Sequence, residues 1–200
     1  MIDITKQLTE KIRRWAPVTG DYLTGVDGLL LLRRDEVFRH DNSYAEPRLV
    51  VGLQGCKYTV AGQSEYWVGQ NQLQILDGHL ISSSRTPGAC PGKPFLSLSL
   101  KLDALLVNGL LDEAPYLSRP VSEDSENQIT ALADPGLLEA LLRLITLLDK
   151  PPQIPYLAPL FIKEIHYRLL LGPLNRRLRS LCSQSRGRIP LESKGWTALH

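Results

Sequence analysis

Residues 48–76 read "RLVVGLQGCKYTVAGQSEYWVGQNQLQIL", and this stretch decides the fold class of the chain. It divides into short apolar runs that are separated by turn-forming sequences, most of which contain glycine. Many short strands with turns at close intervals are typical of a β-sandwich or a β-barrel. The stretch therefore predicts a sheet-rich domain.

The same pattern of short apolar runs and turns continues on both sides of this stretch, over residues 20–101. The predicted strands are Leu29–Arg33, Arg48–Gln54, Cys56–Val60, Glu65–Val68, Gln72–Leu76, His79–Ser83 and Phe95–Lys101. In "FLSLSLKL", residues 95–102, leucines alternate with serines and a lysine. Because successive side chains of a strand point to opposite faces, this alternation predicts one buried face and one wetter face.

Helical patterns flank the predicted sheet on both sides. The predicted helices are Ile4–Trp15, Asp103–Leu111, Asp134–Lys150, Ala158–Leu171 and Leu174–Cys182. Asp3 is a predicted N-cap of the first helix, and Asp134 followed by Pro135 marks the start of the third. The sequence thus predicts a mainly β domain followed by a helical segment.

The leucine-rich helix Asp134–Lys150 has more than one apolar stripe. A helix that is apolar around so much of its circumference must be covered on two sides. One side can be covered by its own domain, and we expect a partner subunit to cover the other. The residues expected at this homodimer interface are Leu138, Leu141, Leu142, Ile145 and Leu148.

Composition argues against bulk phosphate binding. The chain of 200 residues has 23 basic and 21 acidic residues, and its sequence pI of 8.4 lies below the value of about 9 that is typical of nucleic-acid-binding domains. Its three cysteines are far apart, which favours reduced thiols in a cytoplasmic protein. The N-terminus carries charges throughout, unlike a signal peptide, and no apolar run is long enough to span a membrane.

Several motifs together resemble the N-terminal domain of AraC-type transcription regulators. They are "LQGCK", "EYWVGQ", "KPFLSLSLKLD", "LLDKP", "LAPL" and "KEIHYRLLLGP", in this order along the chain. The resemblance covers residues 8–182 and implies a cupin-like jelly-roll barrel followed by helices. It also implies a sensor and dimerisation module without enzymatic activity, which binds an unidentified small-molecule effector and no cofactor.

The resemblance suggests a division into three parts. We expect a sensor barrel with its N-terminal helix over residues 1–112, a connecting and helical region over residues 113–182, and a disordered tail over residues 183–200. In full-length relatives a helix-turn-helix domain follows, which would need about 100 further residues. We expect this DNA-binding domain to be absent, whether the chain is a truncated gene product, a domain taken from a longer protein or a free-standing module.

The basic residues Arg176, Arg177 and Arg179 have two interpretations. They can form a nucleic-acid-binding face, or they can belong to a strut that leads to the absent DNA-binding domain. Useful specific DNA binding takes about 6–10 phosphate contacts, more than this short helix offers. We therefore expect contact with DNA only through the absent domain.

An effector pocket, if it follows the resemblance, lies inside the barrel. The candidate ligand-binding residues are Arg33, Tyr58, Trp67 and His79, which are polar or aromatic residues on otherwise apolar strands. Core packing or surface exposure is the alternative for each of them. Gln54 in the "LQG" turn is a further candidate, although a structural turn at Gly55 is the favoured interpretation.

A metal-dependent cupin enzyme is the first alternative function. Cupin metal sites use a His-x-His pair, and no two histidines of this chain are so close. A site from His40, Asp41, Glu46 and His79 is the remaining arrangement, and we expect no bound metal. Cys90 lacks a neighbouring base that would activate its thiol. The second alternative is an interaction module that pairs with full-length regulators.

Overall fold

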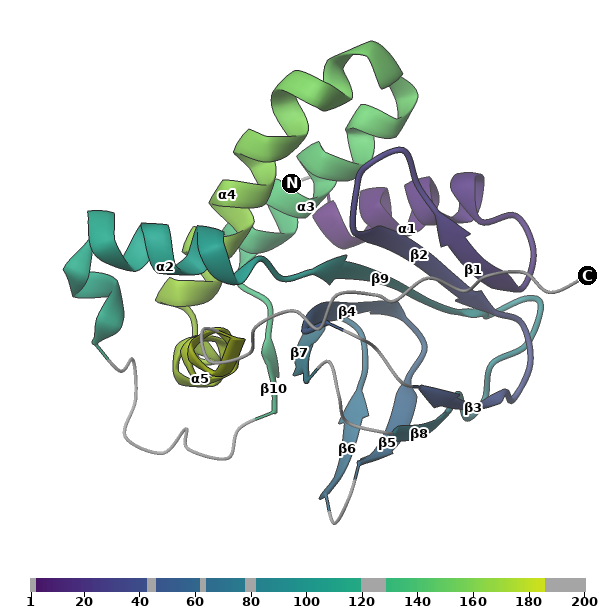
Figure 1. Cartoon of the computed structure of the whole chain (residues 1–200). Coiled ribbons are helices and arrows are strands. Elements are labelled where there is room, and N and C mark those ends of the chain that lie inside the picture. Colours follow the sequence, from purple (N-terminus) through teal and green to yellow (C-terminus); the bar gives the residue numbers. More distant parts are fainter. Residues whose placement is uncertain (1–2, 43–45, 62–63, 78–81, 120–128, 186–200) are drawn as a thin grey trace, which may run out of the picture.

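Two antiparallel sheets face each other in the computed structural model, and helices cover the outer side of the larger sheet (Figure 1). The structure describes residues 3–42, 46–61, 64–77, 82–119 and 129–185. This arrangement confirms the predicted class, a jelly-roll-like β-domain followed by a C-terminal helical segment.

The larger sheet has the strand order β1-β2-β9-β4-β7-β10. Its strands are β1 (Gly20–Leu23), β2 (Leu29–Arg34), β9 (Phe95–Lys101), β4 (Arg48–Gln54), β7 (Gln72–Leu76) and β10 (Thr130–Leu132). The smaller sheet has the order β3-β8-β5-β6. Its strands are β3 (Arg39–Asn42), β8 (Ser82–Arg85), β5 (Lys57–Ala61) and β6 (Ser64–Val68).

The sequence patterns missed three short strands, β1, β3 and β10. Each lies at the edge of a sheet, where pairing with one neighbour stabilises a segment that has no apolar alternation of its own. The strand predicted at His79–Ser83 is observed as β8, Ser82–Arg85, and residues 79–81 lie outside the described part of the chain. Strand boundaries therefore depend on tertiary pairing more than on local composition.

The alternation in β9 separates two buried faces. Leu96, Leu98 and Leu100 belong to the core beneath α1 (Ile4–Trp15). Ser97 and Ser99 point the other way, and both side chains are also fully buried. The expectation of a wetter face is therefore wrong, because the second sheet covers the serines and encloses them in the interior of the domain.

The helices follow the predicted capping signals. They are α1, α2 (Ala104–Glu113), α3 (Pro135–Thr146), α4 (Ile154–Leu171) and α5 (Asn175–Ser185), with 3₁₀ turns η1 (Pro115–Ser118), η2 (Leu147–Asp149) and η3 (Pro151–Gln153). Asp3 Oδ1 accepts the backbone N–H of Thr5 at 2.9 Å, and Asp134 Oδ1 accepts that of Gly136 at 2.8 Å. These bonds satisfy N–H groups that a helix start leaves without partners.

Helix α4 begins four residues before the predicted start at Ala158. Pro155 occupies its first turn, and Pro159 lies inside the helix, although a proline removes one backbone hydrogen bond there. Pro159 is exposed, so this side of the helix faces solvent. Water can then bind the freed carbonyl group, which explains why the helix continues through the proline.

Helix α3 is covered within the chain on both sides, by α1 and by α4 (Figure 1). Leu138, Leu141, Ile145 and Leu148 are buried in the common core, and Leu142 packs against that core. These five residues therefore need no partner subunit, and the reason for expecting them at a dimer interface is removed. The same buried cluster runs from the barrel into the helices, across the boundary predicted at residue 112.

Candidate functional site

The strongest candidate site lies between the two sheets. The strand registers align Leu30, Ser99, Val50 and Gln74 in one row across the larger sheet, on the face away from α1. On β5 of the smaller sheet, Lys57 and Thr59 are buried, while Tyr58 between them is only partly buried. Polar side chains thus come from both sheets into the interior of the barrel.

Electrostatic contacts show that these polar faces lie opposite each other. Burial raises the pKa of Tyr66, the β6 partner of Thr59, and the nearby Gln74 amide of β7 partly opposes this shift. The charges of Arg34 and Asp21, on the strands β2 and β1, affect the pKa of Lys57. The interior is therefore bounded by groups from both sheets.

Two buried groups in this interior have unmet hydrogen-bonding capacity. Gln74 is fully buried, and within the described ranges neither its Nε2 nor its Oε1 has a hydrogen-bond partner of normal geometry. The same holds for the hydroxyl group of Ser97. An unpaired buried polar group costs about 1–3 kcal/mol, so each of them is poised to bind water or a ligand.

Lys57 adds a buried cation to the same interior. No described residue accepts a hydrogen bond from its ammonium group, and burial, followed by the charge of Arg34, lowers its pKa to about 8. The neighbouring cations are engaged. Arg48 Nε donates to Ser99 Oγ at 2.7 Å, and Arg34 is paired with Asp21. Lys57 is therefore available to an anion.

Tyr58 and Trp67 are brought together by the structure, but on the outer face of the smaller sheet. They are cross-strand partners on β5 and β6, with ring centroids 5.0 Å apart. Because residues of a strand alternate between faces, the inward position of Lys57 places its neighbour Tyr58 outside. The expectation that both aromatic residues line the barrel interior is therefore wrong.

The other predicted ligand-binding residues do not form a site with them. Arg33 lies on the face of β2 that carries the helices, where its Nε donates to Asp35 at 2.8 Å and its Nη1 to the carbonyl of Ala16 at 3.1 Å. This is a structural role. His79 lies outside the described residues.

The "LQG" turn is also structural. Gln54 donates from Nε2 to the carbonyl of Pro94 at 2.7 Å and accepts from Arg13 at 3.0 Å. Gly55 has a φ of +73°, a conformation that a side chain disfavours. The favoured interpretation of this turn is confirmed.

The arrangement proposed for a metal is only partly described. Among the described residues there is no group of three histidine, cysteine, aspartate or glutamate residues that could hold an ion. Glu46 pairs with Lys101 at 2.5 Å, whereas the side chains of His40 and His79 lie outside the described part.

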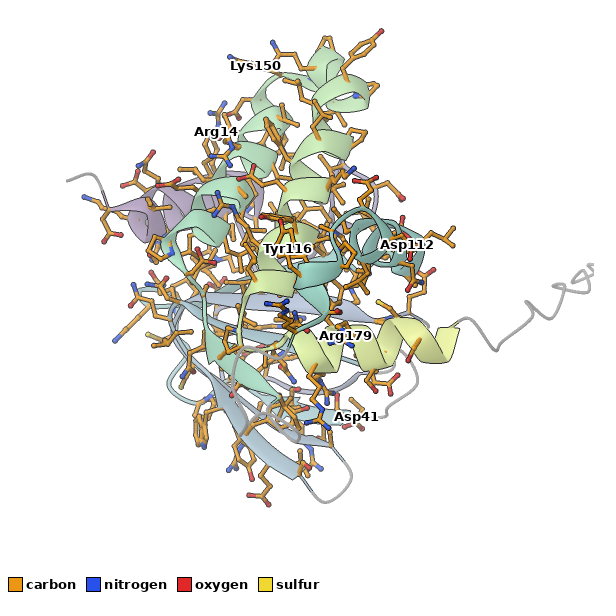
Figure 2. The ribbon with its side chains drawn as sticks, turned by 90° about the vertical axis from the view of Figure 1, so that its left-hand side faces the viewer. Arg14, Asp41, Asp112, Tyr116, Lys150 and Arg179 are labelled. Atoms are coloured by element: carbon orange, nitrogen blue, oxygen red, sulfur yellow. The ribbon has the colours of Figure 1, made fainter. Side chains whose placement is uncertain are left out.

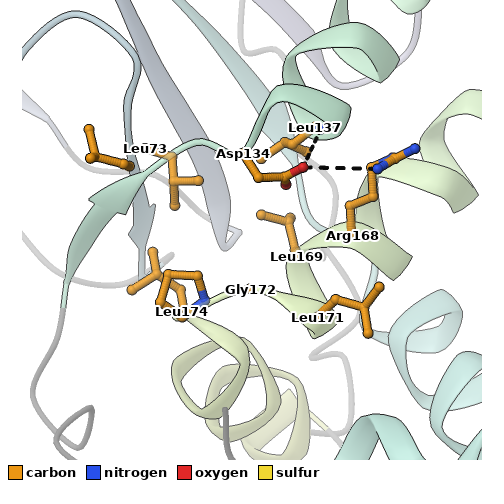
Figure 3. Close-up of a pocket in the computed structure, with 10 residues that line it drawn as sticks. Leu73, Asp134, Leu137, Arg168, Leu169, Leu171, Gly172 and Leu174 are labelled. Atoms are coloured by element: carbon orange, nitrogen blue, oxygen red, sulfur yellow. Dashed lines mark hydrogen bonds and ion pairs between the residues drawn. The ribbon is translucent and has the colours of Figure 1, made fainter. Parts of the chain in front are cut away.

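A hollow lies between β7, β10, α3, α4 and the turn that precedes α5 (Figure 3). It has a volume of about 230 Å³ and is lined mainly by leucines, among them Leu73, Leu169 and Leu174. Its charged groups already have partners, since Asp134 caps α3 and lies 3.9 Å from Arg168. This hollow could enclose an apolar ligand, but its charged groups already have partners. The barrel interior is therefore the stronger candidate for a ligand-binding site.

The arginines of α5 bind the body of the domain. Arg177 Nε donates to the carbonyl of Ile75 on β7 at 2.8 Å. Arg179, labelled on α5 in Figure 2, donates to the carbonyl of Ser118 at the end of η1. Arg177 and Arg179 therefore hold α5 against the domain, which supports a strut over a free nucleic-acid-binding face.

The sequence patterns missed the residues that the interior brings together, Lys57, Gln74 and Ser97. A signal for two of them was present, because the serines of "FLSLSLKL" and the glutamine of "QLQIL" interrupt apolar strands. What the sequence did not indicate is that this polar face is enclosed.

Comparison with known proteins gives a consistent result. The family model of the AraC-type transcriptional regulator N-terminus matches residues 25–177. A structure of apo ToxT from Vibrio cholerae superposes with a TM-score of 0.50 at 10% identity, covering 80% of this chain and 59% of that one. The AraC-like activator CuxR gives 0.45 at 13% identity, covering 84% and 64%.

Other comparisons add little. A cupin superfamily protein from Desulfitobacterium hafniense gives a TM-score of 0.32 at 13% identity, covering 38% of this chain and 66% of that one. No curated protein matches the chain.

In the described ranges, every helix is too short or too polar to cross a membrane.

Proposed function

Because the chain belongs to the AraC-type transcriptional regulators, whose N-terminal domain it matches over residues 25–177, we propose that it is the effector-sensing and dimerisation module of such a regulator. The module is not an enzyme and acts in the cytoplasm. The observation that carries this proposal is a set of buried polar groups between the sheets. They are the Lys57 ammonium, whose pKa burial lowers, and the Gln74 amide and Ser97 hydroxyl, which have no partner of normal hydrogen-bond geometry among the described residues.

These groups suggest the chemistry of the effector. An ammonium group without a partner favours an anionic group, such as a carboxylate or a phosphate. The Gln74 amide both donates and accepts, and the Ser97 hydroxyl does the same, so the rest of the ligand carries polar groups. The effector is therefore a small polar anion.

The contacts of β7 suggest how an effector acts on the rest of the molecule. Gln74 points into the interior, and the carbonyl of the next residue, Ile75, accepts the hydrogen bond from Arg177 of α5. A ligand that binds Gln74 shifts the strand to which α5 is attached. In this way occupancy of the barrel changes the position or the stability of α5.

Dimerisation uses the exposed face of α4 in this proposal, in place of the buried leucines of α3. Tyr156, Leu160 and Leu171 lie on one stripe of α4, with exposed fractions of 78%, 61% and 46%. Exposed apolar side chains along one helix are typical of an interface. The same face would serve a module that pairs with full-length regulators, which is the second candidate.

Contact with DNA belongs to other parts of the regulator in this proposal. Arg177 and Arg179 are used inside the module, so they offer few free charges to phosphates. No described residue favours the metal-dependent enzyme over this function.

The variant Lys57→Met tests the sensing site. A shift of the lysine pKa from 10.5 to about 8 corresponds to about 3 kcal/mol of destabilisation of the charged form. We expect Lys57→Met to be more stable than the wild type at pH 7 by up to about 3 kcal/mol, measured by urea unfolding. We also expect it to lose the rise in melting temperature that small carboxylates or phosphates give to the wild type.

Lys150→Met is the matched control, because Lys150 is exposed. It should keep the ligand-induced rise in melting temperature. A non-aromatic anion that stabilises Lys57→Met as much as the wild type would contradict the proposed site.

A further inference from the structure

The outer face of the smaller sheet carries a groove that is separate from the barrel interior. Its volume is about 420 Å³, within the range of small-molecule pockets. The groove is lined by Val37, Arg39, Tyr58, Val60, Ser83 and Arg85, with some contribution from Ser84. Its walls thus combine two arginines, an aromatic ring and two valines.

The two arginines face each other across the strands β3 and β8. Arg39 and Arg85 are directly opposite in the strand register, and both are exposed. Like charges in opposite positions destabilise a sheet. Within the described part of the chain, neither guanidinium forms an ion pair with a carboxylate, so this end of the groove is suited to an anion.

The other end of the groove is aromatic. The Arg85 guanidinium lies over the Tyr58 ring, 4.7 Å from its centroid, and Trp67 lies beside Tyr58 with half of its surface exposed. A guanidinium stacked on a ring keeps its in-plane N–H groups for an anion. The exposed indole offers a surface on which a planar ring can stack.

The polar groups around Tyr58 agree with this arrangement. The nearby Glu65 carboxylate raises the pKa of the Tyr58 phenol, and the charge of Arg85 opposes this shift. Tyr58 is therefore neutral at physiological pH. The Ser83 side chain adds a hydroxyl group to the groove next to Arg85.

We propose that this groove binds a small aromatic anion, with its planar ring on Trp67 and Tyr58 and its carboxylate or phosphate between Arg39 and Arg85. The site does not depend on the proposed function of the barrel interior. Lys57 lies on the opposite face of β5, so Lys57→Met should leave binding in the groove unchanged.

The test is a titration of the full chain followed by the indole resonance of Trp67 in two-dimensional NMR, assigned by its loss in Trp67→Phe. The probes are adenosine monophosphate, adenosine, inorganic phosphate and benzoate. We expect the monophosphate or benzoate to shift the resonance, and adenosine and phosphate alone to bind at least about tenfold more weakly. The tighter binder of the two aromatic anions, the monophosphate and benzoate, identifies phosphate or carboxylate as the preferred group.

Substitutions distinguish a specific binding site in the groove from nonspecific attraction of anions to the positive charges of the protein. Arg39→Gln and Arg85→Gln should each weaken binding about tenfold, whereas Arg14→Gln, at an exposed arginine of α1, should have no effect. Equal weakening by Arg14→Gln, equal binding of adenosine and its monophosphate, or no shift at millimolar concentrations of every probe would overturn the proposal.

Discussion

At the scale of single residues, His166 connects the barrel to the helices. It is fully buried on α4, where its Nε2 accepts the backbone N–H of Asp103 at 3.0 Å and its Nδ1 lies 2.8 Å from the carbonyl of Ile162. These partners fix the neutral tautomer with the proton on Nδ1, because a protonated Nε2 has no acceptor there. Burial lowers the pKa of His166 below its ordinary value of 6.5.

This shift predicts that acid destabilises the protein. Between the lowered folded-state pKa and about 6.5 the unfolded chain binds more protons at this site than the folded chain does. The contribution of His166 to stability is therefore full above pH 6.5 and is lost as the pH falls below that value. Urea unfolding at pH 7.5 and 5.5 should show this loss.

The comparison variant is His166→Gln, which keeps polar atoms near both partners but does not titrate. It should be less stable than the wild type at pH 7.5 and should depend less on pH between 7.5 and 5.5. An unchanged pH dependence in His166→Gln would assign the acid sensitivity to other groups.

At the scale of elements, α5 depends on side-chain contacts for its position. Arg177 donates from a half-buried guanidinium to β7, and a hydrogen bond from a charged group contributes about 1.5–3 kcal/mol. We expect Arg177→Met, which keeps a long side chain, to accelerate hydrogen exchange of the α5 amides at least about tenfold. The measurement is hydrogen–deuterium exchange with mass spectrometry.

Exchange elsewhere serves as the reference in that experiment. The amides of α1 and α3 should be unaffected in Arg177→Met, and Arg14→Met should leave α5 unchanged. If α5 exchanges at the same rate in Arg177→Met and in the wild type, the bond to Ile75 does not hold the helix in place.

At the scale of the whole molecule, the proposed dimer predicts a defined change in mass. Leu160 is 61% exposed in the centre of the α4 stripe, and a carboxylate there would be buried against a second copy. We expect the wild type to sediment as a dimer of 22.4 kDa chains and Leu160→Glu to sediment as a monomer. Leu23→Glu, at an 89% exposed leucine of β1, should remain dimeric.

A wild-type monomer at high micromolar concentration would contradict dimerisation by this module. A dimer that persists in Leu160→Glu would move the interface away from α4. The two outcomes distinguish between the absence of a dimer and a wrong choice of surface.

Local sequence determined where most elements begin and which residues share a face. The caps Asp3 and Asp134 formed as predicted, and β4, β7 and β9 have the predicted bounds. These features depend on residues that are close in the chain, on backbone capping and on a side-chain period of two, so they can be predicted without tertiary contacts.

Tertiary structure decided which face is inside and which groups are left without partners. The alternation of β5 separates Tyr58 from Lys57, but only the position of the second sheet turns the lysine inward and the tyrosine outward. In the same way, α1 and α4 cover the apolar stripes of α3, and no local pattern distinguishes such cover from a partner subunit. Burial is a property of the assembled elements, and for this reason the candidate site of Lys57, Gln74 and Ser97 emerged only from the fold.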